Sequence, residues 1–451
     1  ELEQPSTAYL FTGQGSASKG MGMDRYAASA TVRNVWDRAE DYLRARFGFS
    51  ILQIVRENPK SFTVHFGGPR GKAIRENLRN LTAQDPSTGQ NVPLLPEISA
   101  TTKSFTFNSP TGLLFATQFS QPALVLVQKA AFEELREAGL VPEKALFAGH
   151  SLGEYAALAG YADSLTIEDL VETVFLRGMV MQNAVPRDSE GRSNYAMVAA
   201  NPLRVGRGFT PEMLSEIVDL ITENEEMGKP LLQIVNFNVR FTQYVVAGEL
   251  LALDALAEAL NLAFAKGVRD VAALAEHGAK TAQASLAKRN GRAEPLKRGK
   301  ATIPLPGIDV PFHSRKLLPG VGAFRKLLAP RFSLQTMEKI IDRLVGNYIP
   351  NVTAEVLSLD RAYAEKVQKV TGSQPMAELL EDFDTATDAE KVRTLVIELL
   401  AHQFAMPVRW IETQDLMFGS HVERVIEMGP SATLTAMAKQ TVKSGAYGDA
   451  E

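Results

Sequence analysis

A short apolar segment that ends in a serine flanked by glycines constrains this chain more than any other feature. The residues Lys144-Ala145-Leu146-Phe147-Ala148 have the length and composition of a buried strand, and they run directly into Gly149-His150-Ser151-Leu152-Gly153. A helical pattern begins at Ser151. A strand, a tight turn and a helix in this order indicate an α/β fold, and the G-x-S-x-G pattern in that setting is typical of a nucleophile elbow.

The spacing of this turn has a steric reason. Glycine is needed two positions to either side of Ser151 because the turn leaves no room for Cβ atoms there. The serine hydroxyl would then stand at a helix N-terminus, where the backbone N–H of Leu152 points to the place at which an oxyanion would form. The same five residues could instead form a tight turn without chemistry. We favour the nucleophile because both flanking elements are present.

The composition is that of a globular protein with a large core. Apolar residues make up 45% of the chain and charged residues 22%, and no stretch approaches the roughly 20 uncharged apolar residues that a membrane span needs. The 48 basic and 52 acidic side chains nearly balance, so the overall charge does not attract polyanions. We therefore expect neither nucleic acid nor a membrane among the partners.

The sequence contains no cysteine, which excludes disulfides, cysteine nucleophiles and thiolate metal sites together. Covalent catalysis would have to use oxygen or nitrogen. We expect no metal site, and we expect the cytoplasm as the location because it is a reducing compartment. The first five residues carry neither an initiator methionine nor a signal-peptide pattern. We therefore interpret the chain as one domain of a longer protein.

The length of 451 residues favours two or three compact units. We expect residues 1–193 and 310–451 to form an α/β core with a hydrolase-like parallel sheet. Between residues 194 and 309 the order strand, helix, two strands, helix predicts a ferredoxin-like α+β subdomain. Strand-like pieces within about residues 60–110 predict an insertion that packs on the core.

A serine hydroxyl needs a positioned base, which is usually a histidine. The six candidates are His65, His150, His277, His313, His402 and His421. We expect His65 and His277 to be ordinary surface or half-buried residues and His150 to point away from the serine. His402 or His421 would suit the order Ser, Asp, His of a standard hydrolase, whereas His313 follows a stiff approach through Pro311. The residues alone leave these last three open.

Six motifs of the chain resemble those of malonyl-CoA:acyl-carrier-protein transacylases and occur in the order of that family. They are Phe11-Thr12-Gly13-Gln14-Gly15-Ser16, Gln121-Pro122-Ala123, Gly149-His150-Ser151-Leu152-Gly153-Glu154-Tyr155, Arg177-Gly178 with Met181-Gln182, Pro311-Phe312-His313-Ser314 and Glu427-Met428-Gly429-Pro430. With the insertion and the run Ile234-Val235-Asn236-Phe237-Asn238, the chain looks most like the malonyl/palmitoyl transferase domain of the β subunit of fungal type I fatty acid synthases. The resemblance spans nearly the whole sequence.

The resemblance implies a catalytic set that the residues alone did not settle. Ser151 would be the nucleophile and His313 its general base. The backbone carbonyl of Gln403 would orient the imidazole, where a triad hydrolase uses a carboxylate. The backbone N–H groups of Gln14 and Leu152 would form the oxyanion hole.

The resemblance also implies how the acyl group is selected. Arg177 would bind the malonyl carboxylate, a task that suits a planar guanidinium. Taken without the family, Arg177 could be a cation that offsets the dipole at a helix C-terminus. Phe312 precedes the histidine, as in the fungal version, and bears on which acyl chains fit. Ala17 departs from the family, which commonly has glutamine there.

The reaction implied by the resemblance is an acyl transfer in fatty acid biosynthesis. Malonyl groups, and palmitoyl or other long acyl groups, would move between coenzyme A and the phosphopantetheine of an acyl carrier protein through an ester on Ser151. The implied partners are malonyl-CoA, long-chain acyl-CoA, an acyl carrier protein domain and the remainder of a fatty acid synthase. The coenzyme A thioesters would be substrates, and no tightly bound cofactor is expected.

Two other functions use the same sequence features. A serine thioesterase or hydrolase would share the elbow, but no carboxylate stands out as its third catalytic group and Arg177 would have no task in it. A scaffold domain without activity would leave the full set of reacting residues unused. We therefore favour the transferase.

A basic stretch precedes His313 in the sequence. Its cations are Lys288, Arg289, Arg292, Lys297, Arg298 and Lys300. It is either a solvated loop or a binding surface for coenzyme A phosphates or an acidic carrier domain.

Overall fold

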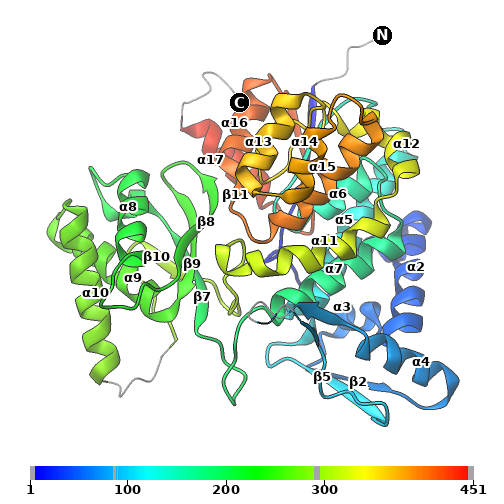
Figure 1. Ribbon diagram of the computed structural model, residues 1–451, viewed down its shortest axis with the longest axis horizontal. Coiled ribbons are helices and arrows are strands. Elements are labelled where there is room, and N and C mark those ends of the chain that lie inside the picture. The colour runs from blue at the N-terminus through cyan, green and yellow to red at the C-terminus, as the bar shows by residue number, and fades with distance from the viewer. Residues whose placement is uncertain (1–5, 85–87, 89, 289–294, 445–451) are drawn as a thin grey trace. The chain divides into compact units, whose positions relative to one another are not determined.

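The computed structural model describes residues 6–84, 88, 90–288 and 295–444. The chain divides into two compact units. The first consists of Glu1–Asn183, Pro319–His402 and Glu412–Glu451, and the second of Ala184–Leu318 and Gln403–Ile411. Each unit is described separately below (Figure 1).

The first unit is built around a parallel sheet. Strand β1 (Thr7–Phe11) lies between β12 (Arg424–Met428) and β6 (Leu146–Gly149) and pairs with both in parallel. All five residues of β1 are buried, as expected for a parallel strand with both faces covered. Phe11 pairs with Met428 on one side and with Gly149 on the other, so the three strands end at the same edge. At such an edge, open α/β sheets bind their ligands.

Helices surround this sheet. They are α1 (Met23–Ala28), α2 (Ala30–Phe47), α3 (Ile51–Glu57), η1 (Leu113–Phe115), α5 (Thr117–Glu137), α6 (Gly153–Gly160), α7 (Ile167–Gln182), α11 (Val321–Leu328), η4 (Ala329–Arg331), α12 (Leu334–Leu344), α13 (Arg361–Thr371), α14 (Gln374–Glu381), α15 (Asp388–Gln403), α16 (Trp410–Gly419) and α17 (Leu434–Lys443). Thr166 caps the start of α7, because its side chain accepts a hydrogen bond from the Asp169 N–H at 3.0 Å.

The predicted insertion forms two small antiparallel pairs and a helix. Its elements are β2 (Ser61–His65), α4 (Gly68–Arg79), β3 (Thr82–Gln84), β4 (Asn91–Pro93) and β5 (Ser104–Asn108), with β2 paired to β5 and β3 to β4. Phe107 of β5 is buried and packs edge-on against Phe119 of α5, with the ring centroids 5.1 Å apart. This aromatic contact fastens the insertion to the core.

The second unit is a five-stranded sheet with helices packed on it. Its elements are β7 (Tyr195–Ala200), η2 (Pro202–Val205), α8 (Pro211–Thr222), β8 (Leu232–Val239), β9 (Gln243–Glu249), α9 (Leu250–Lys266), α10 (Val271–Lys288), β10 (Thr302–Pro304), η3 (Arg315–Gly320) and β11 (Val408–Arg409), with strand order β10-β7-β9-β8-β11. The predicted order strand, helix, two strands, helix is present from β7 to α9. Helices α8 and α9 pack on the sheet, and α10 packs against these two helices (Figure 1).

The limits of the second unit are wider than the expected residues 194–309. Arg187 forms an ion pair with Asp309, and the Ser193 hydroxyl donates to the Asp309 carbonyl. These contacts tie the flanking residues to the subdomain. The distant β11 joins it because Val408 and Arg409 pair in parallel with Asn236 and Phe237 of β8.

Within the described residues, the helices are too short or too polar to cross a membrane.

The core of the second unit generates a stability prediction. Leu256 of α9 is fully buried, whereas Leu203 of η2 is 65% exposed. Replacing Leu256 by alanine should lower the free energy of unfolding by about 2–5 kcal/mol, because it removes buried methyl groups and leaves a cavity. Leu203→Ala, the matched control, should change it by less than about 0.5 kcal/mol. Denaturant unfolding followed by circular dichroism measures both, and equal losses would contradict the assigned core.

Candidate active site

Ser151 stands where β6 turns into α6, and its backbone is strained. Its φ is 52°, in the left-handed region that residues with a side chain rarely adopt. A Cβ atom on Gly149 would lie 2.0 Å from the carbonyl carbon of Gly153, and one on Gly153 would lie 2.0 Å from the Phe11 carbonyl oxygen. Neither contact is possible for a real side chain. The two glycines predicted for steric reasons are therefore required by backbone contacts on both sides of Ser151.

The predicted oxyanion donors come from loops at neighbouring strand ends. Gln14 follows β1 and Leu152 follows β6, and the two strands are hydrogen-bonded to one another. The His150 N–H donates to the Phe11 carbonyl at 2.9 Å, and a Cβ on Gly13 would lie 2.7 Å from the His150 carbonyl oxygen. The Gln14 side chain donates to the Thr117 hydroxyl at 2.9 Å. Close backbone packing thus holds both loops at one edge of the sheet.

Asn351 contacts this turn and was not found by sequence reasoning. Its carboxamide oxygen accepts from the Ser151 N–H at 2.7 Å, and its nitrogen donates to the Gly149 carbonyl at 2.6 Å. The residue lies 200 positions beyond the serine, in a segment that carries no recognised motif.

His313 belongs to the second unit and is held by backbone carbonyls. Its Nδ1 lies 2.9 Å from the Gln403 oxygen and 3.1 Å from the Met406 oxygen, and its own N–H donates to the Phe404 carbonyl at 2.9 Å. A carbonyl can only accept, so Nδ1 carries the proton and Nε2 is the basic nitrogen of the neutral ring. The contact with Gln403 was expected from the family, whereas the contact with Met406 was not.

Arg177 lies in α7 and is almost completely buried, with 2% of its surface exposed. Its Nη1 donates to the Gln121 side-chain oxygen at 2.9 Å, and its guanidinium carbon is 5.4 Å from the centre of the Tyr155 ring. Burial lowers the pKa of the guanidinium, although an arginine keeps its charge at neutral pH. The Gln121 nitrogen reaches the Met181 sulfur at 3.7 Å. Residues of three separate motifs are thus brought together.

Two further residues singled out in the sequence, Phe312 and His402, are buried. The Phe312 N–H donates to the Val310 carbonyl at 2.9 Å. His402 lies in α15, where its Nδ1 donates to the Glu398 carbonyl at 2.8 Å and burial lowers its pKa. His65, His277 and His421 are exposed.

Part of the basic stretch can be placed. Lys288, Lys297, Arg298 and Lys300 are exposed, and the Lys300 ammonium lies 5.5 Å from the centre of the Phe264 ring. Arg289 and Arg292 lie outside the described residues.

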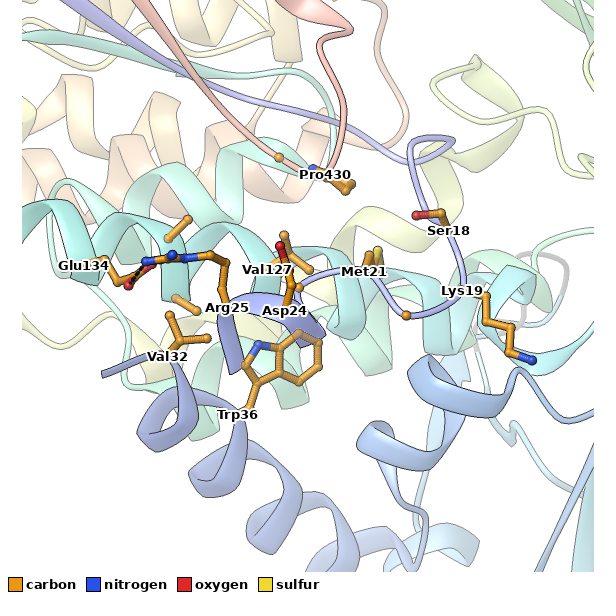
Figure 2. A pocket seen from close by; sticks show the side chains of 15 residues that line it. Ser18, Lys19, Met21, Asp24, Arg25, Val32, Trp36, Val127, Glu134 and Pro430 are labelled. Atoms are coloured by element: carbon orange, nitrogen blue, oxygen red, sulfur yellow. Dashed lines mark hydrogen bonds and ion pairs between the residues drawn. The ribbon is translucent and has the colours of Figure 1, made fainter. Parts of the chain in front are cut away.

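A pocket of about 410 Å³ lies beside the loop that follows β1 (Figure 2). Met21, Val127 and Pro430 are among its apolar residues, and the ion pair between Arg25 and Glu134 stands at one side. None of the predicted site residues lines it. We therefore do not regard it as the site of acyl binding.

Comparison with known proteins agrees with this architecture. The family model described as an acyl transferase domain matches residues 8–375. Fatty acid synthase 2 of Mycosarcoma maydis is 48% identical over 98% of this chain, and the fatty acid synthase subunit beta of Schizosaccharomyces pombe is 46% identical over 85%. The chain spans 12% and 19% of the length of these two relatives. The resemblance to fungal fatty acid synthases seen in the sequence is therefore confirmed.

Solved structures support the predicted fold class. An acyl carrier protein S-malonyltransferase from Vibrio cholerae superposes with a TM-score of 0.54 at 23% identity, with 97% of this chain and 94% of that chain covered. FabD from Acinetobacter baumannii gives a TM-score of 0.56 at 22% identity, with 97% and 91% covered. At these identities the likeness establishes the fold, an α/β core with a smaller inserted subdomain. Since the acyl transferase domain model covers most of the chain, from β1 to α14, this protein belongs to the acyl transferase domain family.

Proposed function

We propose that the chain transfers malonyl groups, and also palmitoyl or other long acyl groups, between coenzyme A and an acyl carrier protein in fatty acid biosynthesis. The observation that carries the proposal is Ser151 in a strained elbow at the edge of the parallel sheet. Support comes from the relatives, which are fatty acid synthases, and from a structural neighbour that is a malonyl-transacylase in complex with a type II PKS acyl-carrier protein. The cytoplasm is the proposed location, since a cysteine-free chain suits it.

The proposed reaction has two matching steps. The Ser151 hydroxyl attacks the thioester carbonyl, and Nε2 of His313 takes its proton. The Gln14 and Leu152 N–H groups stabilise the oxyanion, the carbon–sulfur bond breaks, and coenzyme A leaves with the proton from His313. The phosphopantetheine thiol of the carrier then attacks the Ser151 ester and reverses these steps. Two side chains and two backbone N–H groups supply everything that this exchange needs, so the coenzyme A thioesters act as substrates and no further cofactor is invoked.

Arg177 is the proposed selector of the acyl group. Its guanidinium donates to the neutral carboxamide of Gln121 and faces the Tyr155 ring. A malonyl carboxylate would add a charge-assisted hydrogen bond in a buried setting, whereas an acetyl group offers none. For a palmitoyl chain the guanidinium would have to move aside.

The first experiment tests the catalytic pair. Wild-type protein mixed with malonyl-CoA should carry a persistent malonyl adduct on Ser151, detectable by mass spectrometry of the intact protein. His313→Ala should slow adduct formation by about 100- to 10,000-fold, because the hydroxyl loses its base. His277→Ala removes an exposed histidine of the same unit and should have no effect.

Two results would contradict this proposal. Rapid release of free malonate without a lasting adduct would indicate a hydrolase. An unchanged rate in His313→Ala would show that another group is the base.

A second experiment tests the selector. Arg177→Ala should lower kcat/KM for malonyl-CoA by about 10- to 100-fold, the value of a hydrogen bond to a charged group, while acetyl transfer is kept or improved. Acyl-CoA profiling by mass spectrometry compares the two substrates directly. Arg38→Ala, which removes a half-exposed arginine of α2, serves as the control. Equal loading of acetyl and malonyl groups by the wild type would count against the role of Arg177.

A third experiment tests the basic stretch as a binding surface, which we propose for coenzyme A phosphates or the carrier. Reversing the charges of Lys297, Arg298 and Lys300 should raise the apparent KM for coenzyme A or carrier, because attraction of the acidic partner is lost. Labelling of Ser151 by a fluorophosphonate should not change. The same reversal at three exposed cations of the insertion, Arg70, Lys72 and Lys103, controls for net charge. Equal KM values in both triple variants would identify the stretch as a solvated loop.

A further inference from the structure

We propose that Asn351 is a positioning residue that holds Ser151 in its reactive conformation. The inference rests on the proposed function, since it assumes that Ser151 is the nucleophile. It adds a residue that neither the elbow motif nor the resemblance to the transacylases brought into the site.

The carboxamide of Asn351 bridges the two peptide groups that precede Ser151. Its oxygen accepts from the Ser151 N–H at 2.7 Å, and its nitrogen donates to the Gly149 carbonyl at 2.6 Å. One planar group with one acceptor and one donor thus closes a ring of hydrogen bonds across the turn. The Asn351 side chain is buried, and its bond to the Gly149 carbonyl forms away from water.

These two bonds act on a strained part of the backbone. Ser151 has a φ of 52°, which a serine does not adopt unless the surroundings over-determine it. A change in the φ angle of Ser151 would reorient its N–H relative to its side chain. The hydrogen bond to Asn351 fixes the direction of that N–H. Loss of this bond would allow the turn to relax and would move the hydroxyl away from its attacking position.

Asn351 is itself held by the helix that follows the nucleophile. Its backbone N–H donates to the Glu154 carboxylate at 3.1 Å, and the Tyr348 hydroxyl donates to the same carboxylate. Glu154 lies in the first turn of α6 and is buried. The asparagine, the turn and the start of the helix therefore form one hydrogen-bonded network.

The segment that carries Asn351 also runs beside the strand that carries Ser151. Tyr348 forms a parallel bridge to Phe147, and their rings are nearly parallel with centroids 5.4 Å apart. The Phe147 N–H donates to the Asn347 carbonyl, and the Ile349 N–H donates to the Phe147 carbonyl. This pairing fixes where Asn351 emerges relative to the turn.

The role is distinguishable from simple packing because it needs a donor and an acceptor on one side chain. A carboxylate at this position would offer only acceptors and would oppose the Gly149 carbonyl. A protonated carboxyl would again offer one donor and one acceptor. The labelling rate of an Asn351→Asp variant, divided by that of the wild type at the same pH, should therefore rise as the pH falls through the pKa of the new carboxyl. The ratio removes any effect of pH that both proteins share.

The test uses the full chain and two readouts. The rate of Ser151 labelling by a fluorophosphonate needs neither coenzyme A nor a carrier, and malonyl loading gives kcat and KM. Asn351→Ala should slow labelling and lower kcat by about 10- to 100-fold with KM unchanged, as expected for a displaced reacting group. Asn351→Asp should regain part of the labelling rate at low pH relative to the wild type.

Asn347→Ala is the matched control for lost packing. This buried asparagine of the same segment donates to the Asp342 and Arg343 carbonyls at 3.1 and 3.3 Å, and not to the turn. It should lower the melting temperature and leave the labelling rate of the folded protein unchanged.

The outcomes separate this inference from the proposed function. Wild-type labelling in Asn351→Ala, or an Asn351→Asp rate that follows the wild-type pH profile, would overturn the role of Asn351. If Asn351→Ala does not fold, the pH profile of Asn351→Asp decides. Labelling of wild-type Ser151 without any malonyl adduct would instead overturn the transferase proposal.

Discussion

The close approach of three backbone segments around Ser151 is the constraint on which the rest of the site depends. The end of β1 touches the start of α6 through Gly153, and the end of β6 touches the same residue through Gly149. Only glycine fits at either point, and the resulting turn places a serine in the left-handed region. The strain has a local cost of about 1–3 kcal/mol, which the surrounding packing must offset. The parallel pairing of β1 with both β6 and β12 supplies a rigid frame for that purpose.

Local features of this frame could be predicted from the sequence. The strand and turn before Ser151 and the order of elements from β7 to α9 follow from patterns within a few consecutive residues. The fold class could be predicted as well, because a buried strand runs through a tight turn directly into a helix at Ser151. The contact of Arg177 with Gln121 was not predicted from spacing, although both residues belong to motifs that were singled out.

Contacts between distant segments could not be predicted. Asn351 joins the turn from 200 residues away, and the Met406 carbonyl reaches His313 from 93 residues away. Each of these contacts depends on one side chain or one backbone carbonyl. Such a contact produces no periodicity or motif in the sequence. The same holds for β11, a two-residue strand that assigns Gln403–Ile411 to the second unit. Short pairings between remote segments leave almost no trace in composition.

Different contacts hold the Ser151 turn, where the reaction is proposed to occur, and the Arg177 guanidinium, where the acyl group is proposed to be selected. The Ser151 turn is held by hydrogen bonds from the segment around Asn351, whereas the Arg177 guanidinium is held by Gln121 of α5. Burial disfavours the charge on Arg177 and lowers its pKa, yet the group stays protonated because an arginine begins so far above neutral pH. A buried cation gains most from a ligand that brings its own negative charge. On the proposed function, the identity of the acyl group is therefore decided at Arg177, and the rate at which any acyl group is accepted is decided at the turn.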